Sequence, residues 1–148
     1  MRYSVQAGKD NITMKQRFIE IILQTIQIAQ KLMGLLTQKQ KQEMRDLITR
    51  IAIEERVDAT LACKVAEAES GLNPRAILRN KDLHKSTDRG LFQFNSKWYA
   101  HITDECAFNP ECAARAFCKA VKNGRLKDWR YSAKYWNKDN KYNHLLFL

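Results

Sequence analysis

Glu69 is the side chain most clearly placed for acid chemistry. The spacing i, i+3, i+4, i+7 puts four side chains on one face of a helix predicted over residues 58–69. These are Ala62, Val65, Ala66 and Glu69. Burial at the end of this apolar face and the negative end of the helix dipole both favour a raised pKa for Glu69, as a proton donor needs near neutral pH. The alternative is a solvated, inert glutamate at a fraying helix end.

Asp88 supplies a second carboxyl group. It lies in a polar segment among hydroxyl side chains and next to Arg89, surroundings that favour its ionised form. Glycosidic cleavage commonly uses two carboxyl groups, one to protonate the leaving oxygen and one to handle the developing oxocarbenium charge. Glu69 and Asp88 suit these unlike roles. Taken alone, however, Asp88 could equally be an ordinary turn aspartate.

The segments around both carboxyl groups resemble the lysozyme-like superfamily. Residues 69–74 (ESGLNP) and 90–95 (GLFQFN) look like lytic transglycosylases of the SLT type, and residues 86–98 are also similar to chicken-type lysozymes. The predicted helix and connector before Glu69 match the transglycosylase pattern. Residues 135–137 (YWN) resemble the family's late tyrosine–asparagine motif, with a tryptophan inserted. The resemblance covers about residues 45–142.

The resemblance implies a mainly helical α+β fold of the lysozyme type. We expect a helical lobe, a small lobe with a β-hairpin, a sugar-binding groove between them and an extra N-terminal helix. Glu69 would be the general acid and Asp88 the second carboxylate. Leu91 would help to form the groove floor, and Tyr135 would lie near Glu69. The predicted substrate-binding residues are Ser86, Gly90, Gln93, Asn95, Tyr135 and Asn137.

The implied function is cleavage of the MurNAc–GlcNAc β-1,4 bond in peptidoglycan glycan strands, at the cell wall. Asp88 favours lysozyme-type hydrolysis, because typical transglycosylases have a small residue there and form 1,6-anhydro sugars. A lytic transglycosylase, a non-catalytic wall-binding or interaction module and a chitin-type substrate stay open as alternatives. No cofactor is expected, and His84, His101 and His144 show no metal-ligand spacing.

The charge distribution suits an anionic partner. The formal net charge is +10, and residues 115–141 hold nine basic and two acidic side chains. Anionic wall polymers would fit this balance, whereas no motif supports nucleic-acid binding. Three tryptophans are candidates for stacking on sugar rings or for core packing: Trp98, Trp129 and Trp136.

Four cysteines permit two disulfides. Cys106 and Cys112 flank a short loop and could close it, which leaves Cys63 and Cys118 for a second bridge. Free buried thiols are the alternative.

The first 44 residues lie outside the resemblance and form a predicted extension to a domain over residues 45–148. Residues 1–12 are expected to be loose. Capping boxes at Thr13 and Thr37 predict two helices, over residues 14–36 and 38–55. The first is so broadly apolar that we expect it to pack back on the helical lobe, to self-associate or to dock on a partner. Polar residues interrupt it, so we expect neither a membrane span nor a clean signal sequence. The protein would act outside the cell, in the periplasm or on a virus particle, by an unknown export route.

Overall fold

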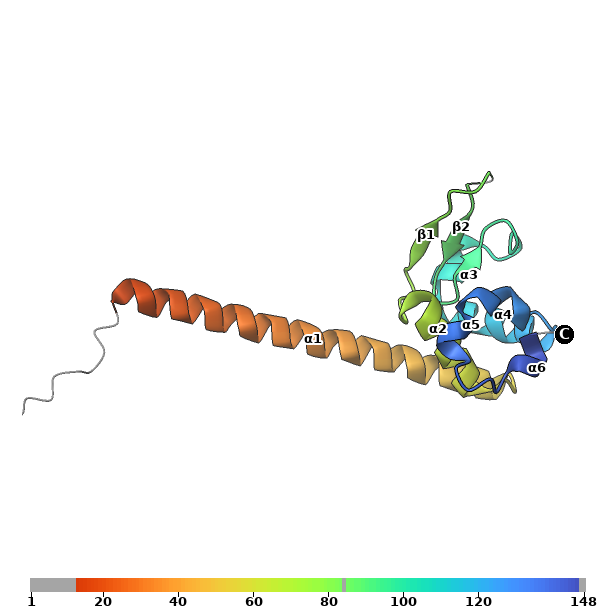
Figure 1. The fold of residues 1–148 in the computed structure, drawn as a ribbon, viewed down its shortest axis with the longest axis horizontal. Coiled ribbons are helices and arrows are strands. Elements are labelled where there is room, and N and C mark those ends of the chain that lie inside the picture. The colour runs from red at the N-terminus through yellow and green to blue at the C-terminus, as the bar shows by residue number, and fades with distance from the viewer. Residues whose placement is uncertain (1–12, 84, 147–148) are drawn as a thin grey trace, which may run out of the picture. The chain divides into compact units, whose positions relative to one another are not determined.

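The computed structural model describes residues 13–83 and 85–146 (Figure 1). Residues 1–12, which were expected to be loose, lie outside this description, as does His84. The chain divides into two compact units, residues 1–39 and residues 40–148. The expected border near residue 44 stays a prediction, because one helix continues through it.

Helix α1 runs from Met14 to Glu54 without a break, so the prediction of two helices was wrong. Thr37 does not cap a new helix. Its hydroxyl instead donates to the carbonyl oxygen of Met33, 2.9 Å away, as threonine can do inside a helix. Without a turn at Thr37 there is no antiparallel packing of the two segments, and every described residue up to position 40 is exposed.

Helix α1 also corrects the expectation that its apolar part cannot span a membrane. It contains an 18-residue window with a mean hydropathy of 1.2, of which 0% is buried. By length and composition the helix is therefore apolar enough to cross a membrane, a criterion that signal sequences near an N-terminus also meet. The interrupting polar residues lower the hydropathy without taking it below that criterion.

The second unit is built around α2 (Ala59–Ser70), the predicted Glu69 helix. Asp58 is its N-cap as predicted, accepting a hydrogen bond from the backbone N–H of Leu61 at 3.1 Å. Gly71 ends the helix with φ of 60°, a left-handed conformation that glycine adopts at low cost. The apolar face that precedes Glu69 is buried, as the spacing predicts: Ala62, Val65 and Ala66.

One hydrophobic core holds this unit together. The last turns of α1 supply three buried residues at helical spacing: Ile48, Ile51 and Ala52. Phe92 stacks on Phe117 with ring centroids 4.3 Å apart, and Trp129 meets Phe117 edge-on at 4.9 Å. The other helical elements are α3 (Asp104–Phe108), α4 (Pro110–Lys122), the 3₁₀ segment η1 (Leu126–Ser132), α5 (Ala133–Trp136) and α6 (Asn143–Leu146).

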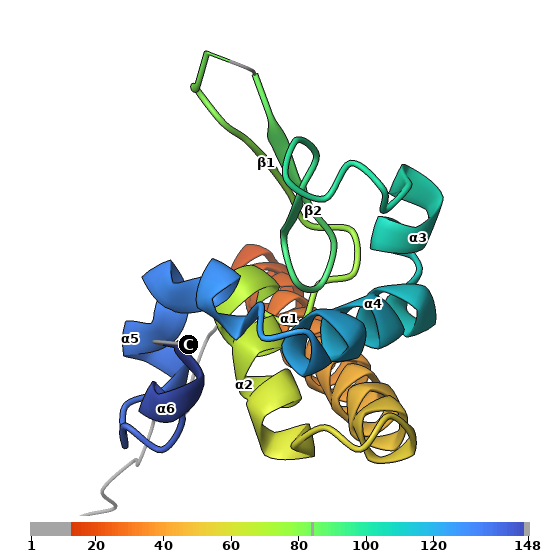
Figure 2. The same cartoon turned by 90° about the vertical axis from the view of Figure 1, so that its right-hand side faces the viewer.

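Three short strands form one antiparallel sheet in the order β1-β2-β3. Figure 2 shows β1 and β2 side by side. They are β1 (Ile77–Arg79), β2 (Thr87–Arg89) and β3 (Phe94–Asn95). The expected small hairpin is therefore part of a three-stranded sheet. Asp88 occupies its middle strand, with Leu78 opposite on β1 and Asn95 opposite on β3.

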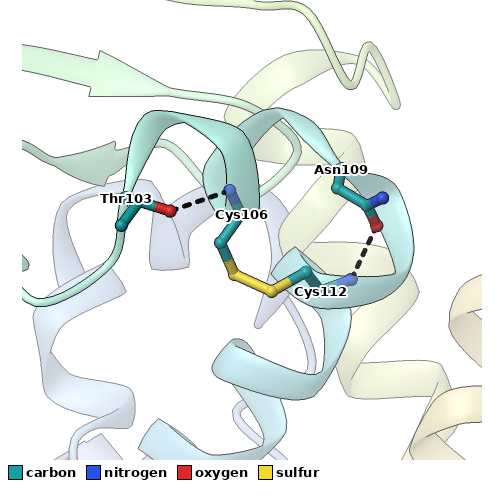
Figure 3. Close-up of a disulfide and its surroundings, with 4 residues drawn as sticks. All are labelled: Thr103, Cys106, Asn109 and Cys112. Atoms are coloured by element: carbon teal, nitrogen blue, oxygen red, sulfur yellow. Dashed lines mark hydrogen bonds between the residues drawn. A yellow bond between two sulfur atoms is a disulfide. The ribbon is translucent and has the colours of Figure 1, made fainter.

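Helices α3 and α4 are joined by the predicted disulfide, Cys106–Cys112, with Cα atoms 5.1 Å apart (Figure 3). Thr103 caps α3 by accepting a hydrogen bond from the backbone N–H of Cys106 at 3.2 Å. Asn109 caps α4 in the same way, accepting from the N–H of Cys112 at 3.0 Å. Each cysteine thus lies in the first turn of its own capped helix.

The second predicted disulfide was wrong, because Cys63 and Cys118 are free. Cys63 faces α1, where its sulfur lies 3.5 Å from the Thr49 hydroxyl and 3.7 Å from the Arg45 carbonyl oxygen. Cys118 is 1% exposed and packs in the core. Burial raises the pKa of both thiols, which keeps them in the unreactive protonated form.

Removing the Cys106–Cys112 bridge should destabilise the second unit moderately. The loop it closes is short, so chain entropy predicts a loss of about 2 kcal/mol in the free energy of unfolding. A Cys106→Ser/Cys112→Ser variant should melt several degrees below the wild type. A Cys63→Ser variant is the matched control, and a reductant should lower the melting temperature of this control but not that of the double variant. Equal melting of the double variant and the wild type would contradict the prediction.

Candidate active site

Glu69 lies in the last turn of α2, at the inner end of the buried stripe. One of its carboxyl oxygens accepts a hydrogen bond from the Ser132 hydroxyl, at the end of η1. Burial raises the pKa of Glu69, the Ser132 hydrogen bond lowers it, and the nearby charge of Asp88 raises it. The net direction is upward, as predicted from the sequence. A raised pKa lets the group carry a proton at a pH where an ordinary glutamate is ionised.

Ser132 is held by two tryptophans. Its Oγ accepts a hydrogen bond from the Trp136 indole N–H at 2.9 Å. The same Oγ also lies 3.0 Å from the Trp129 carbonyl oxygen, a second acceptor for its single proton. The positions of Trp129, Ser132 and Trp136 relative to one another are well defined, because η1 leads directly into α5 and both indole rings are buried.

Asp88 is held on β2 by amide groups rather than by a cation. Its two carboxyl oxygens accept hydrogen bonds from the side-chain amides of Asn80 at 3.0 Å and Asn95 at 2.7 Å. Both amides also donate to the Ser86 hydroxyl, at 3.1 Å and 3.0 Å. Ser86 is 2% exposed and in turn donates to Asp82. It therefore helps to orient the two amides and is itself covered from solvent.

Arg89 follows Asp88 in the sequence, but its guanidinium group does not pair with the Asp88 carboxyl group as expected. Consecutive side chains on a strand point to opposite faces, and Arg89 points away from Asp88 into the protein. It is 6% exposed, pairs with Asp104 at 2.5 Å and donates to the Phe94 carbonyl oxygen at 3.2 Å. Arg89 thus ties the sheet to α3.

The turn between β2 and β3 needs two positive φ angles. Gly90 has φ of 72°, and a Cβ atom there would lie 1.8 Å from the Ala107 carbonyl oxygen, so only glycine fits. Gln93 has φ of 50° and donates from its side-chain amide to the Gly90 carbonyl oxygen at 2.9 Å. The predicted extended run over residues 90–95 is consequently confirmed only at its end, in β3. Leu91 is fully buried beneath the turn.

Glu69 and Asp88 line the same cleft, which has a volume of about 580 Å³. Of the predicted substrate-binding residues, Gln93 and Asn95 also line it. Four aromatic residues contribute to its walls: Trp98, Tyr99, Trp129 and Tyr131. Three basic residues lie along the same cleft: Arg125, Lys127 and Arg130. The cleft thus combines two carboxyl groups with aromatic and cationic surfaces.

In the motif at residues 135–137, the aromatic residue connected to Glu69 is Trp136 and not Tyr135, which was expected to lie near it. Tyr135 is 60% exposed and lines a different pocket, together with Lys64 and Glu67. Trp136, the following residue, is the one linked to Glu69 through Ser132. Asn137 is buried away from the cleft, where it binds Asn143 and the backbone N–H of Tyr142.

The tryptophans separate into core and surface positions. Trp129 and Trp136 are 5% and 1% exposed, and Trp129 donates from its indole to the Phe92 carbonyl oxygen at 2.7 Å. Trp98 is 67% exposed at the cleft, and the Lys97 ammonium group lies over its ring, 4.6 Å from the ring centroid. Tyr131, which sequence reasoning did not single out, is 82% exposed there.

Sequence reasoning also missed Ser132 and Asn80. A serine next to aromatic residues and an asparagine in a polar segment carry no distinctive signal, because their roles depend on contacts across 63 and 8 positions of the chain. Within the described part of the chain, no group of three or more His, Cys, Asp or Glu side chains could hold a metal ion.

Two carboxyl groups line one cleft: Glu69, whose pKa is raised, and Asp88, which accepts hydrogen bonds from two side-chain amides. Together they define a candidate acid–base site of the glycosidase type. A family model described as a lysozyme-like domain matches residues 49–131, which is more than half of the chain. The chain therefore belongs to the lysozyme-like domain family. Comparisons with curated proteins and with solved structures give no match. The family indicates a glycosidase that acts on peptidoglycan, and hence action at the cell wall.

Proposed function

We propose that this protein cleaves the MurNAc–GlcNAc β-1,4 bond of peptidoglycan by lysozyme-type hydrolysis, with Glu69 as general acid and Asp88 as second carboxylate. The observation that carries the proposal is the pair of carboxyl groups in one cleft with unlike surroundings. Glu69 is partly buried and has a raised pKa. Asp88 has both oxygens engaged by amide N–H donors, an arrangement that suits a carboxylate.

The chemistry follows from these two environments. Glu69 gives its proton to the glycosidic oxygen as the bond to the anomeric carbon breaks, and the leaving sugar departs with a free hydroxyl group. Asp88 faces the positive charge that develops at the anomeric carbon and stabilises it, as an ion pair or a covalent ester. The ionised Glu69 then takes a proton from a water molecule, whose oxygen attacks the anomeric carbon and, where an ester has formed, displaces the Asp88 carboxylate. This step restores the protonated Glu69.

The walls of the cleft are suited to a glycan strand. Trp98 and Tyr131 expose flat faces that can cover the C–H faces of sugar rings. Arg125, Lys127 and Arg130 provide positive charge along the same cleft, which favours anionic wall polymers. Gln93 adds a side-chain carbonyl oxygen that can accept a hydrogen bond from a sugar hydroxyl, whereas the amide of Asn95 is committed to Asp88, Ser86 and the backbone.

The decisive experiment is digestion of purified peptidoglycan followed by mass spectrometry of the released fragments. Hydrolysis produces reducing-end MurNAc, whereas a lytic transglycosylase produces 1,6-anhydro-MurNAc. We expect reducing ends. If the fragments carry 1,6-anhydro-MurNAc ends instead, the enzyme is a lytic transglycosylase and the hydrolytic mechanism is wrong. No fragments above the level of a Glu69→Gln control would indicate a wall-binding module, and release from chitin alone would change the substrate.

Ser132→Ala should move the pH dependence of cleavage. The substitution removes the one effect that lowers the pKa of Glu69 and leaves the two that raise it, burial and the charge of Asp88. Since the protonated form is the active one, the alkaline limb of kcat/KM against pH should shift to higher pH. Ser132→Thr, which keeps a hydroxyl group, should retain the wild-type limb. A limb that stays in place or moves to lower pH in Ser132→Ala would show that Ser132 does not tune Glu69.

A further inference from the structure

The apolar part of α1 is a heptad repeat, independent of the catalytic cleft. Residues 18–24 (FIEIILQ), 25–31 (TIQIAQK) and 32–38 (LMGLLTQ) align position by position without a gap. We call residues 18–38 the stem segment. The second, fourth and fifth positions are apolar in all three heptads, and the third and seventh are never occupied by a large apolar residue. Three heptads in register indicate a coiled coil.

The repeat contains two seams side by side, each with the alternating three- and four-residue spacing of coiled-coil core positions. The first seam is apolar throughout: Ile19, Ile22, Ile26, Ala29, Met33 and Leu36. The second has one threonine among apolar residues: Phe18, Ile21, Thr25, Ile28, Leu32 and Leu35. A two-stranded coiled coil uses a single seam, so the second seam calls for a second neighbour.

The structure leaves both seams uncovered. The stem segment is helical throughout and all of its residues are exposed. In the second seam, for example, Phe18, Ile21, Ile28 and Leu35 are 66%, 60%, 61% and 60% exposed. A contiguous apolar surface of this kind marks an interaction site.

The period of the pattern favours neighbouring helices over lipid as the occupant of both seams. An ideal straight helix has 3.6 residues per turn, so a seven-residue repeat drifts by about 20° per heptad unless the helices supercoil. Lipid chains surround a helix on all sides and impose no such period. The third and seventh positions of the heptads, with glutamines at three of six places, also form a stripe that faces water beside a bundle.

The geometry of the seams points to further copies of this chain. The two seams are one residue apart, which separates them by about 100° around the helix axis. Neighbours in a closed ring subtend about 90° for four helices and about 108° for five, and cyclic symmetry closes such rings in homo-oligomers. The stem segment has a single acidic residue, Glu20, and a single basic one, Lys31, so no oppositely charged partner is needed. We propose that it assembles four or five copies into a left-handed helical bundle.

The test is the mass of the full chain in detergent-free buffer, by sedimentation equilibrium. We expect a species of four or five times the chain mass of 17.3 kDa. An Ile21→Gln/Ile28→Gln variant removes one seam and should form no more than dimers through the other. Adding Ile19→Gln/Ile26→Gln should produce monomers. Gln27→Glu, on the polar stripe, is the matched control and should keep the wild-type mass.

Two readouts keep the result clear. All three tryptophans follow residue 97, so an unchanged near-ultraviolet circular dichroism spectrum shows that the second unit of each variant is folded. Flotation with phosphatidylcholine vesicles tests the lipid alternative. A wild-type chain that is trimeric or smaller in buffer would overturn the proposal, as would recovery of wild-type protein with the vesicles. Equal loss of assembly in the Gln27→Glu control would also count against it.

Discussion

The Glu69→Gln variant should lose wall-cleaving activity by on the order of 10²–10⁴-fold or more. The amide has the same shape as the carboxyl group and can still accept the Ser132 hydrogen bond, but it has no acidic proton to give. The loss should therefore appear in kcat, with binding of glycan fragments largely retained. Turnover of purified peptidoglycan is the measurement.

Glu67→Gln is the matched control for this substitution. Glu67 lies on the same helix and forms an exposed ion pair with Arg45, so removing its charge should leave cleavage nearly unchanged. If Glu69→Gln digests peptidoglycan at a rate near that of the wild type, Glu69 is not the general acid.

The Glu69→Gln variant should also be more stable to unfolding than the wild type at neutral pH. The folded state raises the pKa of Glu69, so the stability it contributes is fully present below the unfolded pKa and is lost as pH rises through the folded pKa. Glutamine does not ionise and avoids this loss. The gain in melting temperature should therefore be larger at pH 7 than at pH 4.

The second large effect is expected for Asp88→Asn. If Asp88 stabilises the oxocarbenium charge, its neutral replacement should cost on the order of 10²-fold or more in kcat, comparable to removing a principal electrostatic group from an active site. In a transglycosylase that relies on a hydroxyl of the substrate, the loss should be modest and anhydro ends should persist. Rate and product must be measured together.

The control for Asp88→Asn addresses the hydrogen-bond network. Asp82→Asn changes a carboxylate that accepts from the Ser86 hydroxyl at 2.6 Å and so disturbs the same sheet without altering the charge at the cleft. It should cost far less activity. Similar losses in the two variants would mean that Asp88 acts by organising the sheet and not through its charge on the substrate.

Much of the second unit could be predicted from short-range sequence signals. Asp58 and Gly71 mark the ends of α2 because capping depends on residues a few positions apart. The partial burial of Glu69 followed from helical spacing alone, since the residues before it on that face are small or apolar. The disulfide Cys106–Cys112 followed from the shortness of its loop.

The predictions that failed needed knowledge of direction or of distant contacts. A threonine followed three residues later by glutamine can cap a helix or lie within one, and at Thr37 nothing in the neighbouring sequence stops the helix. The bridge Cys63–Cys118 required both side chains to face each other, but Cys63 faces α1. Tyr135 and Trp136 differ by one position, which is about 100° around a helix, so only the fold could show which one approaches Glu69.

The contacts of Ser132 allow its hydroxyl group to bind Glu69 in both the ionised and the protonated form. When Glu69 is ionised, the serine proton can point to it. When Glu69 is protonated, the glutamic acid can donate to Oγ while the serine proton turns to the Trp129 carbonyl oxygen at 3.0 Å. The Trp136 indole donates to Oγ in both cases. A rotation about a single C–O bond thus accommodates both halves of the reaction cycle, and no heavy atom around the acid has to move between turnovers.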